Sequence, residues 1–141
     1  MQYAVYGTKV VVRIDKGEEI HAALADLCQR LDIRAAAVTA GIGALNKVSL
    51  GWFEQETKKY YTQEFAGSME ITSLAGNVSR MDGKPYLHLH VNLTDRAYKT
   101  FGGHMNFGQV GATCEVVLDT IDGQVERAWS EEIGLNLFKL E

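Results

Sequence analysis

Proline, cysteine and long apolar runs are scarce in this chain. Its 141 residues include one proline and two cysteines, and no apolar segment reaches the roughly 18 residues that indicate a membrane-spanning helix. No charged segment followed by an apolar run opens the chain, so the sequence predicts neither export nor membrane insertion. Cys28 and Cys114 have no C-x-x-C partner and stand among apolar neighbours, which indicates buried thiols in a reducing cytoplasm.

A concentrated patch of basic residues is also lacking. The formal net charge is -4, and the densest basic groups are Lys58-Lys59 and the pair Arg96 and Lys99. Proteins that bind DNA strongly usually neutralise its phosphates with a basic patch or stripe. The charge therefore argues against strong DNA binding, although an oligomer could bring scattered charges together.

Length and composition favour one folded domain. A chain of 141 residues with 46% hydrophobic content can bury a core without disulfides or metal ions as staples. No polar tract, linker or internal repeat interrupts it. Residues 1–141 are therefore predicted to form a single domain.

Hydrophobic periodicity predicts one helix near the start of the chain and about eight strands after it. Asp15 and Glu18 have capping-box spacing, and apolar residues then recur every three or four positions to about Leu31. Alternating and β-branched runs predict strands at 3–14, 34–45, 48–53, 59–65, 69–80, 86–94, 109–121, 124–130 and 135–140. This order predicts an α+β fold with a mainly antiparallel sheet.

Glycine-containing pairs mark the expected turns. The pairs are Gly67-Ser68, Asp82-Gly83 and Asp122-Gly123, and the last predicts a two-residue hairpin. Gly41 and Gly43 lack the third glycine and the following helix of a nucleotide-binding loop. They are predicted to permit close backbone packing or a bulge.

The strand predicted from Tyr86 to Thr94 carries half of a candidate metal site. Apolar residues alternate with polar ones along it, so His88 and His90 share the polar face. Side chains two residues apart on a strand are separated by roughly 7 Å, so both imidazoles can reach one ion at about 2.1 Å from each nitrogen.

His104 is the third candidate ligand. Gly102 and Gly103 precede it, and paired glycines permit a tight or left-handed backbone that would fold His104 back towards His88 and His90. Three imidazoles favour Zn²⁺, with other divalent metals possible, and leave one position for water or a ligand oxygen. In the alternative interpretation, these histidines only form hydrogen bonds across strands or at a contact between chains.

Glu115 is the candidate catalytic residue. It stands inside the apolar run 113–118, where a carboxylate normally pairs with a cation or a metal-bound group. It is a candidate base or orienting group for the histidine site, with a plain salt bridge or an exposed position as the alternatives. No catalytic triad, phosphate loop or cofactor motif names a reaction, so enzymatic activity and substrate stay undefined.

Three segments, H-L-H-V-N-L-T-D-R (88–96), F-G-G-H-M (101–105) and T-C-E-V-V-L (113–118), resemble the plants-and-prokaryotes-conserved (PPC) domain. The resemblance covers nearly the whole chain and implies a compact α+β domain that assembles as a homotrimer. It also places His88, His90 and His104 at positions that match prokaryotic single-domain members. Aromatic residues such as Trp52 and Tyr60 on predicted strands, more than one helix can cover, favour an oligomer independently.

The resemblance implies a second possible function. In plants the domain follows AT-hook motifs in nuclear DNA-binding proteins, so DNA binding is the alternative to a metal site that binds a small ligand or partner. Pro85 is the only proline, so no R-G-R-P of an AT-hook is present. The plant partner-contact segment Gly-Arg-Phe-Glu-Ile-Leu corresponds to G-S-M-E-I-T at 67–72, which lacks the arginine and the aromatic residue.

Overall fold

The computed structural model describes residues 1–140, which contain one helix and eight strands. These elements are β1 (Gln2–Tyr6), β2 (Lys9–Asp15), α1 (Ile20–Arg30), β3 (Ala36–Glu54), β4 (Lys59–Met81), β5 (Lys84–Thr94), β6 (Thr100–Thr120), β7 (Glu126–Ser130) and β8 (Leu135–Lys139). The protein is thus mainly β-sheet with one short helix, as predicted. Within residues 1–140 no helix combines the length and the apolar character needed to cross a membrane.

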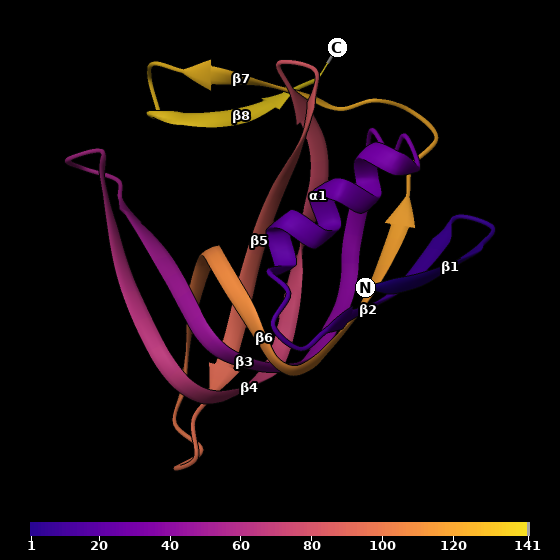
Figure 1. Ribbon diagram of the computed structural model, residues 1–141. Helices are drawn as coiled ribbons and strands as arrows, with labels where there is room; N and C mark the ends of the chain where they lie inside the picture. The colour runs from indigo at the N-terminus through magenta and orange to yellow at the C-terminus, as the bar shows by residue number, and fades with distance from the viewer. Residues whose placement is uncertain (141) are drawn as a thin grey trace.

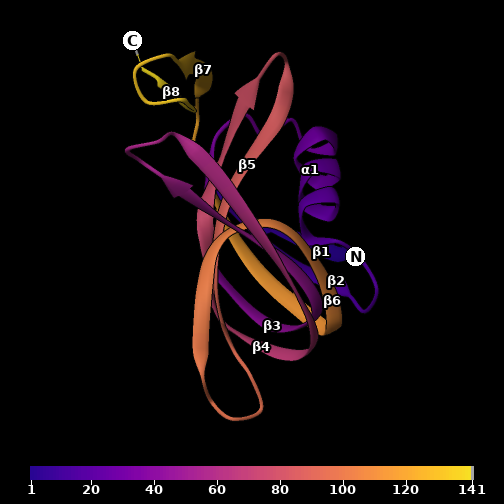
Figure 2. The ribbon, with the colours of Figure 1, turned by 90° about the vertical axis from the view of Figure 1, so that its left-hand side faces the viewer.

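Four long strands form a closed circuit. β3 pairs with β4, β4 with β5, β5 with β6, and β6 with β3, all in antiparallel register. β2 and β1 continue the sheet from β6, whereas the β7–β8 hairpin joins β4 through one parallel pairing, Arg80 with Glu126. Figures 1 and 2 show the long strands bent around the interior and the β7–β8 hairpin set apart at one end.

The helix begins later than the capping-box spacing predicted. The Asp15 amide donates to Glu18 Oε2 at 2.7 Å, but the N-cap is Glu19, whose carboxylate accepts two amides of the first turn. Glu19 also accepts the Gly108 amide at 3.1 Å, which ties the helix start to β6. Burial alone would raise the pKa of Glu19, but the hydrogen bonds, including that from His21, outweigh burial and lower the pKa to about 2.

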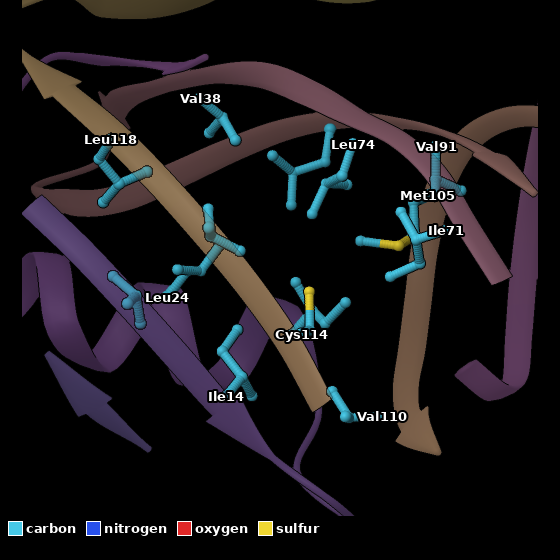
Figure 3. Close-up of a cluster of buried hydrophobic side chains, with 14 of the residues drawn as sticks. Ile14, Leu24, Val38, Ile71, Leu74, Val91, Met105, Val110, Cys114 and Leu118 are labelled. Atoms are coloured by element: carbon cyan, nitrogen blue, oxygen red, sulfur yellow. The ribbon is translucent and has the colours of Figure 1, made fainter. Parts of the chain in front are cut away.

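The core lies between α1 and the curved sheet (Figure 3). The helix packs against β5 and β6 through its apolar face, which buries Leu24 and Cys28. Strand residues such as Leu74, Met105 and Cys114 complete the cluster. Cys28 and Cys114 are both free and buried, so the prediction of two buried cysteines is confirmed. Burial raises the pKa of both thiols to about 12.

Several predicted strand boundaries are wrong. The predicted strand 3–14 is a hairpin, because Gly7, at φ 58°, turns the chain between β1 and β2. The predicted break at Gly67-Ser68 is a bulge inside β4, where Gly67 has φ 119°. The strands predicted at 34–45 and 48–53 form one strand, β3, which begins only at Ala36. Gly43, at φ 145°, lies beside a register shift, in agreement with the predicted bulge.

The two Asp-Gly pairs behave differently. Asp82 and Gly83 have φ values of 51° and 75° and join β4 to β5 in a hairpin, as the type I′ turn requires. Asp122-Gly123 does not form the predicted hairpin. The end of β6 already pairs with β2 on one side and β3 on the other, so no free edge remains for a returning strand. The following residues become β7, which pairs with β8 and β4.

Candidate metal centre

Three histidines converge where β5 pairs with β6. His88 and His90 stand two residues apart on β5, as the alternation predicted, and His104 of β6 is the cross-strand partner of His90. One ring nitrogen from each of the three lies within 4.8 Å of the others. The structure thus brings together all three residues that the sequence suggested as metal ligands.

The turn that delivers His104 is not the one predicted. The chain reverses at residues 95–99, where Asp95 Oδ1 accepts two backbone amides at 2.8 and 3.0 Å and Tyr98 has φ 59°. Gly102 and Gly103 lie inside β6 instead, paired with β5. A Cβ at Gly102 would collide with the Val91 carbonyl, so the glycine permits close approach of the two strands.

The spacing of the His88 and His90 ring nitrogens fits a tetrahedral metal ion. Nε2 of His88 and Nε2 of His90 are 3.2 Å apart, and two nitrogen ligands of a tetrahedral Zn²⁺ lie about 3.3 Å apart when each bond is about 2.05 Å. The His104 ring centroid is 5.0 Å from that of His88 and 5.4 Å from that of His90. The three histidines could therefore hold a metal ion and leave a further position free for another ligand.

The surroundings favour the neutral form of two of the imidazoles. The pKa of His104 is lowered to about 4, mainly by burial and with smaller contributions in the same direction from the neighbouring His88 and His90 rings. Burial also lowers the pKa of His88, with a smaller contribution from the positive charge of Arg127. A neutral imidazole has a lone pair available for a metal near pH 7.

Arg127 of β7 lies beside His88. Its Nη2 is 3.5 Å from Nδ1 of His88 and donates to Asn77 Oδ1 at 2.9 Å. Its Nε donates to Ser79 Oγ at 2.8 Å, and its Nη1 donates to the Asn136 carbonyl at 2.7 Å. These bonds fix the guanidinium at the edge of the histidine cluster.

A pocket of about 880 Å³ lies over the histidines, between the end of the β3–β4 hairpin and the β7–β8 hairpin. Its walls are rich in aromatic rings. The Arg127 guanidinium lies 4.7 Å from the centroid of Tyr86 and 4.4 Å from that of Phe138. Tyr60 and His104 form an edge-to-face pair, with their ring centroids 6.1 Å apart. Such pockets have the size and lining of small-molecule sites.

Gly51 makes room for one of these rings. Gly51 is the β3 partner of His104, and a Cβ at that position would collide with the Tyr60 hydroxyl. That hydroxyl donates to Asn106 Oδ1 at 2.8 Å. Gly51 and Arg127 cannot be recognised as site residues from the sequence, because a lone glycine or arginine in a strand has no pattern that indicates a metal or ligand site.

Glu115 lies outside the histidine pocket. It is exposed on β6, where it pairs in register with Arg13 of β2 and Ile42 of β3. The run around it alternates, so Cys114 and Val116 are buried while Glu115 faces solvent. The structure does not bring this carboxylate to the histidines. Of the three interpretations given for Glu115, namely a group of the histidine site, a salt bridge or an exposed position, the structure shows the exposed position.

Fold and site together define a mainly antiparallel β domain with a three-imidazole cluster. The chain belongs to the Plants and Prokaryotes Conserved (PCC) domain family, whose model matches residues 1–122. This is the family that the histidine-containing segments resembled. The β7–β8 hairpin, which supplies Arg127, follows the matched residues.

Solved structures of similar proteins share the fold over almost the entire chain. A candidate DNA-binding protein from Bacteroides thetaiotaomicron is 31% identical, with a TM-score of 0.94 and coverage of 98% of this chain and 96% of that one. A metal-containing protein from Archaeoglobus fulgidus is 34% identical, with a TM-score of 0.89 and coverage of 99% and 97%. A plant- and prokaryote-conserved (PPC) protein from Pyrococcus horikoshii is 31% identical, with a TM-score of 0.86 and coverage of 99% and 96%.

Similarity also extends to part of a longer protein. The bifunctional protein GlmU from Synechococcus sp. (strain JA-3-3Ab) is 28% identical over 118 residues, which are 82% of this chain and 18% of that protein. GlmU from Synechococcus sp. (strain JA-2-3B'a(2-13)) is 27% identical over 108 residues, 76% of this chain and 16% of that protein. The chain therefore spans less than a fifth of the length of these relatives.

Proposed function

We propose that the protein binds a divalent metal ion, preferably Zn²⁺, through His88, His90 and His104, and that the remaining position takes a small ligand or a group from a partner. The observation that carries the proposal is the convergence of three imidazole nitrogens within 4.8 Å. The similar Archaeoglobus fulgidus protein is described as metal-containing, which supports it. When bound, such an ion would supply a Lewis-acid centre for a ligand oxygen.

Metal analysis of protein purified without a His-tag tests this proposal. We expect about one Zn²⁺ per chain after zinc exposure and dialysis, and loss of that ion in His88→Ala and in His104→Ala. His21→Ala is the matched control, because His21 is the fourth histidine and is not part of the cluster. Absence of bound zinc in the wild-type protein, or unchanged stoichiometry in both cluster variants, would contradict the proposal.

We also propose that the domain forms a homotrimer in the cytoplasm. Support comes from large apolar side chains outside the histidine pocket that a single copy leaves exposed, including Val5 at 53%, Ile42 at 58% and Trp129 at 54%. Light scattering at micromolar concentration is expected to return three times the 15.6 kDa mass of one chain. A mass equal to one chain would contradict this part of the proposal.

DNA binding is the second candidate function, because the similar Bacteroides thetaiotaomicron protein is described as a candidate DNA-binding protein. The net charge of -4 opposes it. A gel-shift assay with duplex DNA at low salt tests for DNA binding. We expect no shift, and a shift that weakens as salt is added would favour the DNA-binding function instead.

A further inference from the structure

Among residues 1–140, no carboxylate side chain lies in the histidine pocket or pairs with its positive charge. The residues that line the pocket include Arg127 but no aspartate or glutamate. Within residues 1–140, Arg127 forms no ion pair with a carboxylate. Neutral imidazoles do not offset the charge of a divalent ion either, so the loaded site would combine the metal charge with that of Arg127. Partly buried charges without partners are costly, and an anionic ligand would remove this cost.

The guanidinium is held in place before any ligand arrives. Asn77, Ser79 and Asn136 accept its hydrogen bonds, and the Tyr86 and Phe138 rings both contact it. Nη1 carries two hydrogens, and among the described residues only the Asn136 carbonyl accepts from it. One N–H group therefore remains available for a single ligand oxygen.

The remaining walls suit a flat apolar group. Trp52, Phe53, Tyr60 and Phe138 line the same pocket as the histidines. Trp52 is 62% exposed and Phe138 is 44% exposed, so one copy of the chain leaves much of their surface uncovered. Aromatic rings of a ligand stack well on such surfaces.

We infer that the ligand of this site is an organic carboxylate with an aromatic or similarly flat apolar body, an inference that rests on the proposed metal site. One carboxylate oxygen would occupy the open metal position, the negative charge would face Arg127, and the apolar body would lie against the rings. A phosphate is less well matched, because its three terminal oxygens need several charged donors and the lining offers one arginine and no lysine.

Calorimetric titration of the zinc-loaded wild-type protein with small probes tests this assignment. Benzoate and benzamide share a shape and differ in charge, whereas acetate keeps the carboxylate and lacks the ring. We expect benzoate to bind at least about tenfold more tightly than benzamide, since one charge-assisted hydrogen bond contributes a factor of that order. Benzoate is also expected to bind more tightly than acetate, because only benzoate has a ring that can stack on the aromatic walls. In protein loaded with Co²⁺, benzoate but not benzamide is expected to change the visible absorption spectrum, because the carboxylate oxygen enters the coordination sphere.

A second set of titrations locates the binding residues. Arg127→Gln is expected to weaken benzoate binding about tenfold, whereas Arg96→Gln, an exposed arginine outside the pocket, is expected to leave it unchanged. Because Arg127 also anchors β7, Trp52→Ala serves as a second variant and is expected to weaken benzoate more than acetate. The wild-type comparison of probes does not depend on either variant.

The outcomes separate the inference from the proposed function. Failure of zinc or cobalt to bind would overturn both. Metal binding with equal affinity for benzoate and benzamide would overturn only the carboxylate assignment, as would tighter binding of phenyl phosphate than of benzoate. An unchanged cobalt spectrum on benzoate binding would show that the carboxylate does not reach the metal.

Discussion

His90 of β5 and His104 of β6 are direct cross-strand partners, with ring centroids 5.4 Å apart and ring planes at 89°. Side chains alternate between the two faces of a strand, so a register slip of one residue would turn His104 towards the core and separate the pair. The turn at residues 95–99 joins these two strands. The register at the histidine cluster therefore depends on a turn that lies outside it.

Asp95→Ala is expected to lower the free energy of unfolding by about 1–2 kcal/mol, because the carboxylate accepts two turn amides that would lose their partner. Urea denaturation measures the change. Asp122→Ala, in the loop after β6, is the matched control and is expected to change stability by less than about 0.5 kcal/mol. Equal effects of the two substitutions would show that the Asp95 side chain does not stabilise the turn.

Gly51→Ala is expected to destabilise the protein by about 1–3 kcal/mol, because the new methyl group collides with the Tyr60 hydroxyl. In a Tyr60→Ala background the collision is removed, so the same substitution is expected to cost much less. A double-mutant cycle of unfolding free energies measures this difference. Additive effects would mean that the backbone of β3, and not the Tyr60 ring, opposes a side chain at position 51.

Glu19→Gln tests the link between α1 and β6 through pH. The folded-state pKa of about 2 lies below the usual 4.5, so the unfolded chain binds this proton more readily. Stability due to Glu19 is therefore fully present above about pH 4.5 and is lost as pH falls towards 2.

The expected difference between wild type and Glu19→Gln is about 1 kcal/mol at neutral pH, typical of an N-cap residue. It should shrink steadily below pH 4.5. Thermal unfolding followed from pH 7 to pH 2 measures it. Glu56→Gln, at an exposed turn, is the control and should show no such pH dependence. A constant gap across the range would contradict the assigned role of the carboxylate.

Both cysteines are expected to resist alkylation in the folded protein, because burial raises the pKa of each thiol to about 12 and excludes the reagent. Mass spectrometry after iodoacetamide treatment should find no modified Cys28 or Cys114 without denaturant and full modification with it. Ser68→Cys, at an exposed bulge, provides a positive control that should react in the folded state. Modification of Cys114 as fast as the thiol introduced by Ser68→Cys would contradict the described packing of β6.

The sequence predicted the histidine cluster because alternation along a single strand is a local property. The pattern from Tyr86 to Thr94 placed His88 and His90 on one face, and the structure agrees. The approach of His104 was predicted for the wrong reason. The expected Gly102-Gly103 turn does not exist, since those glycines accommodate the neighbouring strand and Asp95 supports the turn.

Features that depend on long-range pairing were not predictable in the same way. Asp122-Gly123 has the residue types of a hairpin, but β6 has no free edge there for a returning strand. Arg127 reaches His88 only because β7 joins β4 through the pairing of Glu126 with Arg80, two residues that are 46 positions apart in the sequence. Glu115 was a candidate site residue because it stands in an apolar run. Its alternation with buried Cys114 and Val116 explains why it faces solvent instead.

The two sides of the pocket are attached to the domain with unequal strength. β5 is hydrogen-bonded to β4 along one edge and to β6 along the other, whereas β7 meets the main sheet at a single pairing. Amide protons near His88 and His90 should therefore exchange with solvent only when the whole domain unfolds, while those of the β7–β8 hairpin exchange through local opening. The imidazoles then keep a constant geometry, and the Arg127 side chain is held by Asn77 and Ser79 of β4, while the β8 wall of the pocket opens and closes. A ligand would thus have a route in and out that leaves the three histidines undisturbed.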